Sequence, residues 1–331
     1  MSDELPLACV AITLPFDVEQ GLADMCRLRQ VPPGASPPEI KAALADAEGL
    51  LCSALFPIDA ELMAAAPRLR VISNFGVGFN NVDLPEATRR GIAVCNTPKV
   101  LSEAVADLTM GLILAASRNL VANADFVRGG RWSAREAPPP LGFDVEGKTL
   151  GLIGFGRIGR EVARRARAFR MRILYHDVEP VLTGEWTFCA HRELDHLLLE
   201  SDVVSLHVNL TAKTHHMIGQ GELGLMQRSA WLINTSRGAV VDQAALVTAL
   251  KQGRIAGAAL DVLETEPPAA DDPILSLPNV IVLPHVGSAT VETREAMLEL
   301  AVRNLGAVLQ GERPSECVNP EALNQAIKRR D

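Results

Sequence analysis

Three closely spaced glycines, Gly154, Gly156 and Gly159, form a G-x-G-x-x-G pattern within "GLIGFGRIGRE". They follow the apolar stretch "TLGLI" and open a helix-like stretch, which is the order found in phosphate-binding turns. There the first glycine permits a tight bend, the second admits a pyrophosphate, and the third lets helix pack on strand. The start of the helix attracts the phosphates. The pattern predicts a dinucleotide-binding loop made of Gly154, Phe155, Gly156, Arg157, Ile158 and Gly159.

A carboxylate follows at the distance expected of a ribose ligand. Asp177 ends the next apolar stretch, "MRILYHD", 18 residues beyond Gly159. A carboxylate at this place accepts hydrogen bonds from the ribose hydroxyls and repels the 2′-phosphate of NADP. Val178 leaves no adjacent arginine to receive that phosphate, although His176 and Arg172 are close in the sequence. The pattern therefore favours NAD over NADP.

Polar residues also follow later apolar stretches, where ligands bind at the carboxyl edge of an open α/β sheet. His207 follows "DVVSL", and we expect its backbone to line the cofactor groove. Three further stretches end in the same way, "LINTSRGAVVD" (232–242), "ALDVLETEPP" (259–268) and "VIVLPHVGSATVETR" (280–294). They place an arginine, carboxylates and a histidine at the predicted edge.

With the glycine pattern, these stretches resemble the D-isomer-specific 2-hydroxyacid dehydrogenase family, in particular its glyoxylate/hydroxypyruvate reductase-like members. "NFGVGFNNVD" (74–83) and "ADLTMGLILAASR" (106–118) extend the resemblance over most of the chain. It implies that Arg237 binds the substrate carboxylate and carbonyl oxygen, for which a planar, charged guanidinium is suited. It implies that His285 is the acid–base residue. Glu266 is then the carboxylate that holds this imidazole and favours its protonated form.

The same resemblance assigns further contacts. For the substrate they are the backbone N–H groups of Val77 and Gly78, together with Arg237 and His285. For the cofactor they are Thr109, Thr214, Thr235 and Asp261. No metal is implied at the site.

The implied reaction is the NAD(H)-dependent reduction of a small 2-oxo acid, such as glyoxylate or hydroxypyruvate, to the D-2-hydroxy acid. Alternatives are a reductase that prefers NADPH or a bulkier acid such as hydroxyphenylpyruvate, and a non-catalytic, NAD-sensing corepressor of the same fold. Phosphite dehydrogenase is disfavoured, because it has a lysine where this chain has Val77.

The elements that must position these residues form two alternating series of strands and helices, which predict parallel sheets. Apolar stretches at 8–13, 49–55, 70–76 and 92–96 form the first series, and those near 149–153, 172–176, 203–206, 230–234, 256–260 and 280–283 form the second. Long helices are expected over 102–127 and 289–309, with a Pro/Gly-rich loop containing Trp132 at 129–148.

The predicted fold is α/β, with two doubly wound parallel-sheet domains and a cleft between them. A flavodoxin-like substrate domain takes 1–100 and 290–331, and a Rossmann NAD-binding domain takes 101–289. The family leads us to expect a homodimer formed through the cofactor domain.

The composition of the chain limits the classes of binding partner that we expect. The chain has 331 residues, a net charge of −8 and a pI near 5.5, which disfavours nucleic acid or an anionic membrane surface. We expect neither a membrane span nor a secretory signal. The six cysteines are scattered without a C-x-x-C pair, so we expect a cytoplasmic protein with no disulfide framework and no metal site.

Overall fold

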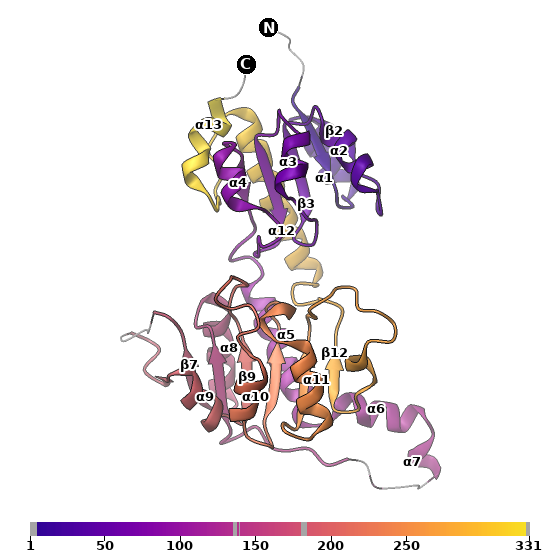
Figure 1. Cartoon of the computed structure of the whole chain (residues 1–331), viewed down its shortest axis with the longest axis vertical. Helices are drawn as coiled ribbons and strands as arrows, with labels where there is room; N and C mark the ends of the chain where they lie inside the picture. The colour runs from indigo at the N-terminus through magenta and orange to yellow at the C-terminus, as the bar shows by residue number, and fades with distance from the viewer. Residues whose placement is uncertain (1–4, 135–137, 139, 180–183, 329–331) are drawn as a thin grey trace. The chain divides into compact units, whose positions relative to one another are not determined.

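The computed structural model describes residues 5–134, 138, 140–179 and 184–328. It divides into two compact units, Met1–Leu101 with Thr290–Asp331, and Ser102–Ala289. The boundary between them falls after residue 101, one residue later than the sequence led us to expect. In each unit, helices cover both faces of a parallel sheet (Figure 1). The predicted α/β class with two doubly wound sheets is confirmed.

The first unit contains a sheet of five parallel strands in the order β2-β1-β3-β4-β5. The strands are β1 (Leu7–Val10), β2 (Arg27–Gln30), β3 (Gly49–Ser53), β4 (Val71–Phe75) and β5 (Ala93–Cys95). The helices are α1 (Phe16–Ala23), α2 (Pro37–Leu44), α3 (Ala60–Ala65), α4 (Leu84–Arg89), α12 (Val291–Gln310), the 3₁₀ helix η3 (Pro320–Ala322) and α13 (Leu323–Lys328).

The central strands of this unit are buried on both faces, which explains why their sequences are almost continuously apolar. Leu50 and Ile72 enter the core on one face. Their neighbours Leu51 and Val71 enter the opposite core, where Leu305 of α12 packs. Each such side chain contributes about 1.5–3 kcal/mol by burial. The C-terminal helix α12 thus completes the core of the N-terminal unit.

The second unit contains a sheet of seven parallel strands in the order β12-β11-β10-β9-β6-β7-β8. The strands are β6 (Thr149–Ile153), β7 (Arg172–His176), β8 (Cys189–His191), β9 (Val203–Leu206), β10 (Trp231–Asn234), β11 (Gly257–Leu260) and β12 (Val280–Val282). The helices are α5 (Ser102–Ser117), α6 (Leu120–Arg128), α7 (Arg131–Ala134), α8 (Arg157–Ala168), α9 (Leu194–Glu200), α10 (Gln220–Leu225) and α11 (Gln243–Lys251), with the 3₁₀ helices η1 (Gly238–Val240) and η2 (Pro273–Ser276).

The strand order of this unit reverses between β6 and β9, because the chain proceeds from β6 to β8 on one side and from β9 to β12 on the other. Open α/β sheets bind ligands at such a switch point, at the carboxyl ends of the strands. The glycine-rich loop follows β6 and therefore lies at this point.

The prediction of one long helix over 102–127 is wrong in one respect. The chain forms two helices there, α5 and α6, with a 61° bend between them. Asn119 takes a left-handed conformation with φ of 48°, and the N–H of Phe143 donates to the carbonyl oxygen of Ser117 at 2.7 Å. Asparagine tolerates this conformation better than most residues. Among the described residues, no single helix is long and apolar enough to cross a membrane, and α5 and α6 meet the criterion only as a bent pair.

Candidate functional site

The glycine-rich loop of the second unit connects β6 to α8. Gly154 has φ of +95°, and a Cβ there would lie 2.7 Å from the backbone carbonyl of His207. A Cβ at Gly159 would lie 2.3 Å from the carbonyl oxygen of Gly154, so a side chain would push α8 away from the loop. A Cβ at Gly156 would meet no heavy atom within 4 Å. The loop thus combines two crowded glycines with one open position, which fits the pyrophosphate of a dinucleotide at the start of α8.

Asp177 follows β7 and is fixed beside this loop. Its Oδ2 accepts a hydrogen bond from the N–H of Phe155 at 2.6 Å, and its Oδ1 accepts from the N–H of Glu179 at 3.2 Å. Arg160 of α8 supports the loop, because its Nε donates to the carbonyl oxygen of Phe155 at 2.9 Å. The Phe155 ring stacks on Tyr175, with 4.1 Å between centroids. The carboxylate expected to bind ribose therefore has a defined orientation at the switch point.

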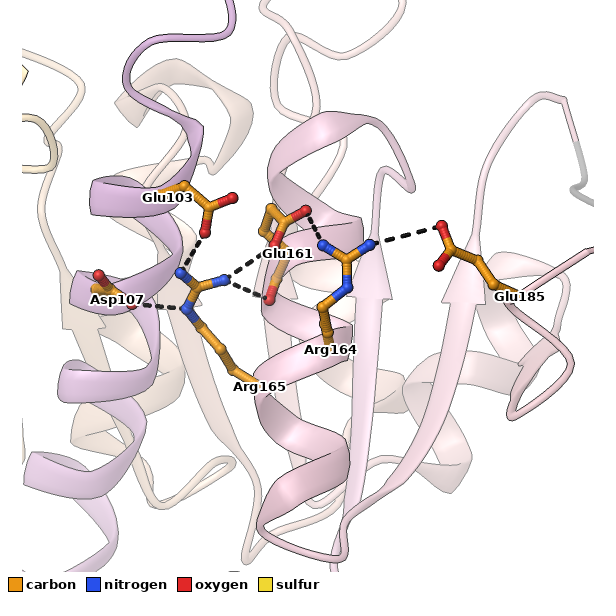
Figure 2. Close-up of polar contacts among 6 residues, drawn as sticks. All are labelled: Glu103, Asp107, Glu161, Arg164, Arg165 and Glu185. Atoms are coloured by element: carbon orange, nitrogen blue, oxygen red, sulfur yellow. Dashed lines mark hydrogen bonds and ion pairs between the residues drawn. The ribbon is translucent and has the colours of Figure 1, made fainter.

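A charged cluster joins α8 to α5 (Figure 2). Arg165 of α8 lies 2.6 Å from Glu103 and 2.6 Å from Asp107, both on α5, and 3.1 Å from Glu161 one turn earlier on α8. Single exposed ion pairs contribute about 0–1 kcal/mol, and a shared guanidinium combines several of them. The cluster links the helix that starts at the glycine-rich loop to the helix that carries Thr109.

The expected catalytic residues follow three adjacent strands of the same sheet. Arg237 lies in the turn after β10, Glu266 in the loop after β11, and His285 directly beyond β12. His285 Nδ1 and Glu266 Oε2 are 2.7 Å apart. The Arg237 side chain donates to the carbonyl oxygen of Ser236 at 2.6 Å. The fold thus brings these three residues to one sheet edge.

Their charges depend on one another. Burial by itself would raise the pKa of Glu266, but the hydrogen bond and charge of His285, the N–H of Leu263 and the charge of Arg237 lower it below its ordinary value. Burial lowers the pKa of Arg237, and the charge of Glu266 opposes this. An arginine remains charged under such a shift. An anionic Glu266 can accept a hydrogen bond from Nδ1–H of His285. This leaves Nε2 of the ring to exchange a proton with a substrate.

Asp261 holds the segment that carries His285. His285 has a left-handed conformation with φ of 54°, and its N–H donates to the Asp261 carbonyl oxygen at 2.9 Å. The two carboxylate oxygens of Asp261 accept the N–H groups of Val286 and Gly287, each at 2.8 Å. Burial raises the pKa of Asp261 despite these hydrogen bonds. Asp261, which the sequence led us to expect at the cofactor, thus fixes the backbone of His285.

The threonines expected to contact the cofactor fall into two groups. The hydroxyls of Thr109 and Thr235 are 2.9 Å apart, and Thr109 also donates to the carbonyl oxygen of Val105. Thr214 instead belongs to a separate turn, where its hydroxyl donates to the carbonyl oxygen of Asn209 at 2.6 Å. The structure therefore brings Thr109 and Thr235 together and leaves Thr214 with local contacts in the described part of the chain.

His207 follows β9, and its backbone lies against Gly154 of the glycine-rich loop. Its N–H donates to the carbonyl oxygen of Ile153 at 2.7 Å, and its Nε2 lies 2.9 Å from the Ser205 hydroxyl. Burial lowers the pKa of His207 to about 3. The ring is consequently neutral near pH 7 and adds no charge to the site.

This shift predicts a pH dependence of stability. The unfolded chain takes up a proton at His207 near its ordinary pKa of 6.5, whereas the folded protein does so near 3. As the pH falls through this window, the unfolded state gains the proton first, so the free energy of unfolding decreases. We expect a His207→Gln variant to lose less stability than the wild type between roughly pH 6.5 and 4. The measurement is denaturant unfolding across this range, with His196→Gln, at an exposed position of α9, as control. Parallel curves of unfolding free energy against pH for His207→Gln and the wild type would contradict the interpretation.

The first unit contains the other expected substrate residues, in the loop that follows β4. Asn96 Nδ2 donates to the carbonyl oxygen of Val77 at 2.8 Å, and Asn74 Nδ2 donates to that of Gly78 at 2.7 Å. Among the described residues, none accepts a hydrogen bond from the N–H of Val77 or Gly78. The loop thus has its carbonyl groups bound by side-chain amides and two backbone donors available for an anion. Sequence reasoning named these two N–H groups as expected substrate contacts and missed both asparagines.

Comparison with known proteins points to one family. Residues 110–287 match the family described as "D-isomer specific 2-hydroxyacid dehydrogenase, NAD binding domain". A glyoxylate reductase of Thermofilum pendens is 50% identical over 281 residues, which cover 84% of this chain and 83% of the relative. A glyoxylate reductase of Korarchaeum cryptofilum is 50% identical over 285 residues and covers 84% of both chains.

The solved structures similar to this chain include glyoxylate reductases as well. The crystal structure of a glyoxylate reductase from Paecilomyes thermophila is 33% identical with a TM-score of 0.88, covering 97% of this chain and 100% of its own. An NADPH-dependent glyoxylate/hydroxypyruvate reductase from Sinorhizobium meliloti, in complex with NADP and malonate, is 37% identical with a TM-score of 0.85. That alignment covers 96% of this chain and 97% of the other.

Proposed function

We propose that the chain, which belongs to the D-isomer specific 2-hydroxyacid dehydrogenase family, reduces a small 2-oxo acid of the glyoxylate or hydroxypyruvate type to the D-2-hydroxy acid. The observation that carries this proposal is the 2.7 Å contact between His285 Nδ1 and Glu266 Oε2, at the sheet edge where Arg237 also lies. Relatives named glyoxylate reductase, at 50% identity, favour small 2-oxo acids.

A nicotinamide cofactor held at the loop of Gly154, Gly156 and Gly159 would supply the hydride for reduction of the carbonyl carbon. Arg237 binds the substrate carboxylate and the carbonyl oxygen, and its charge stabilises the negative charge that develops on this oxygen. His285 then donates the proton from Nε2 to the oxygen, while Glu266 holds the ring through Nδ1. In the first unit, the N–H groups of Val77 and Gly78 are donors of the kind that a carboxylate accepts from.

The cofactor in this proposal is NAD(H). The loop around Gly156 and the start of α8 fit a pyrophosphate, and the carboxylate of Asp177 is fixed beside that loop at 2.6 Å from the N–H of Phe155. A carboxylate in this place repels a 2′-phosphate. The Sinorhizobium meliloti relative is NADPH-dependent, and the preference of this chain is assigned from its own residue Asp177.

The proposal is tested by following the loss of NADH or NADPH absorbance with glyoxylate, hydroxypyruvate, pyruvate and phenylpyruvate in turn. We expect the highest kcat/KM with NADH and either glyoxylate or hydroxypyruvate. A preference for NADPH would contradict the role of Asp177 and leave the catalytic assignment intact. A preference for phenylpyruvate would overturn the small-substrate assignment. No turnover with any of the acids would count against the proposed function.

The proposed assembly is a homodimer formed by the second unit. Large apolar side chains on and near α6 and α7 are exposed, namely Leu120, Val121, Val127, Trp132 and Leu141. Such a concentration on one segment is typical of an interaction surface. We expect light scattering to give twice the chain mass of 35.5 kDa, and a Trp132→Glu variant to shift the mass toward the monomer. Val178→Glu, at another exposed apolar position of the same unit, serves as control. A monomeric wild type would refute the assembly.

The proposed location is the cytoplasm. All six cysteines lie in the described part of the chain and are unpaired. Unpaired cysteines in this number are typical of a reducing compartment.

A further inference from the structure

Two adjacent histidines and a glutamate form a cluster outside the catalytic residues. Within the described part of the chain, His215, His216 and Glu264 are the group whose ligand atoms are close enough to share a metal ion, all within 4.8 Å of one another. His216 Nε2 lies 2.7 Å from Glu264 Oε1. The rings of His215 and His216 stack with 4.0 Å between centroids.

The backbone holds the cluster in place from both sides. The N–H of His216 donates to the carbonyl oxygen of Ala239 at 2.8 Å. On the other segment, the N–H of Glu264 donates to Gln243 Oε1 at 3.1 Å, and the N–H of Gln243 donates to Glu264 Oε2 at 3.3 Å. The segment 239–243 therefore aligns both the histidines and the glutamate before any ligand arrives.

We propose that His215, His216 and Glu264 bind a divalent transition metal of the zinc class. Two imidazole nitrogens and one carboxylate oxygen are ligands that Zn²⁺ and Co²⁺ accept, with water in the remaining position. In a tetrahedral site with bonds of about 2.0–2.1 Å, neighbouring ligand atoms are about 3.3 Å apart. His216 Nε2 and Glu264 Oε1 are already 2.7 Å apart, and all three ligand atoms lie within 4.8 Å of one another. The side chains are half-buried or exposed, so small rotations close the site.

The location connects this metal site to the catalytic residues. A Cβ at Gly238, which follows Arg237, would lie 1.8 Å from the carbonyl oxygen of Leu263, so the two segments are in direct contact. The N–H of Leu263 donates to Glu266 Oε1 at 2.9 Å. A metal that pulls Glu264 toward the histidines therefore acts on the backbone next to Arg237 and Glu266. We expect it to inhibit the reaction, an expectation that rests on the proposed function.

Binding is tested without reference to catalysis by titrating the metal-free protein with Co²⁺. We expect intense visible d–d bands from a tetrahedral or five-coordinate site, saturating at one Co²⁺ per chain and displaced by Zn²⁺. His215→Ala, which leaves the His216–Glu264 contact in place, should weaken binding by at least about tenfold. His196→Ala, an exposed histidine on α9, is the matched control and should bind like the wild type. Weak octahedral bands, or equal binding by wild type and His215→Ala, would overturn the site.

The effect on activity is measured separately by adding Zn²⁺ to the wild type and to both variants. We expect inhibition of the wild type and of His196→Ala, and for His215→Ala a Zn²⁺ requirement at least about tenfold higher. Binding of Co²⁺ without inhibition by Zn²⁺ would overturn the link to Arg237 and Glu266. The sequence predicted no metal site because its cysteines lack the spacing, whereas this cluster joins residues 48 positions apart.

Discussion

Replacing His285 with alanine lowers kcat by about 10²–10⁴, the range expected when a general acid is removed. The imidazole is the proposed proton donor; its Nδ1 lies 2.7 Å from Glu266, and Asp261 fixes the backbone that carries the ring. In the variant, a water molecule that no side chain orients must donate the proton to the substrate oxygen. KM for the oxo acid changes much less, since Arg237 still binds the carboxylate.

The measurement is steady-state oxidation of NADH with the preferred oxo acid. His285→Asn serves as a second variant, because its Nδ2 takes the place of the histidine Nδ1 and can donate to Glu266 but transfers no proton. Both variants should be similarly slow, and His196→Ala should behave like the wild type. A near-wild-type kcat in either His285 variant would refute the assignment.

Removal of Arg237 has the second large effect. We expect Arg237→Ala to lower kcat/KM by about 10²–10³, the loss found when a buried donor to a developing oxyanion is removed. The guanidinium can donate two parallel hydrogen bonds to a carboxylate. Its loss also deprives the half-buried Glu266 of a neighbouring cation. KM for the oxo acid therefore rises and kcat falls.

Arg237→Lys separates charge from geometry. It retains a cation but not the planar pair of donors, so we expect an intermediate loss that falls mainly on KM. Thermal unfolding of each variant distinguishes a damaged fold from a damaged site. An unaltered KM for the oxo acid in Arg237→Ala would remove this residue from substrate recognition.

Much of the fold could be predicted because buried parallel strands leave a clear pattern. The central strands β6 and β9 are buried throughout and mostly apolar, and the sequence predicted both. The edge strands β2 and β8 were missed. β2 has the sequence "RLRQ" and is partly exposed, and β8 has only three half-buried residues. An edge strand pairs with only one other strand and can be partly exposed to solvent. Its sequence therefore need not be continuously apolar, and such a strand is harder to recognise.

The candidate site was predictable only in part. Residue type and position at strand ends indicated a binding edge, and the family resemblance selected Arg237, Glu266 and His285 among similar residues. The support for His285 was not predictable, because Asp261 acts through backbone N–H groups 25 and 26 positions away. The break at Asn119 was hidden for a similar reason. A helix-like pattern continues across it, and the bend depends on a distant backbone contact from Phe143.

The central claim is that this chain transfers a hydride to the second carbon of a 2-oxo acid to give the D-isomer. The most direct test supplies hydroxypyruvate and NADH carrying deuterium at the reactive position of the nicotinamide, and analyses the product by mass spectrometry and chiral chromatography. The account predicts D-glycerate with deuterium on its second carbon. L-glycerate, or a product without deuterium, would contradict it.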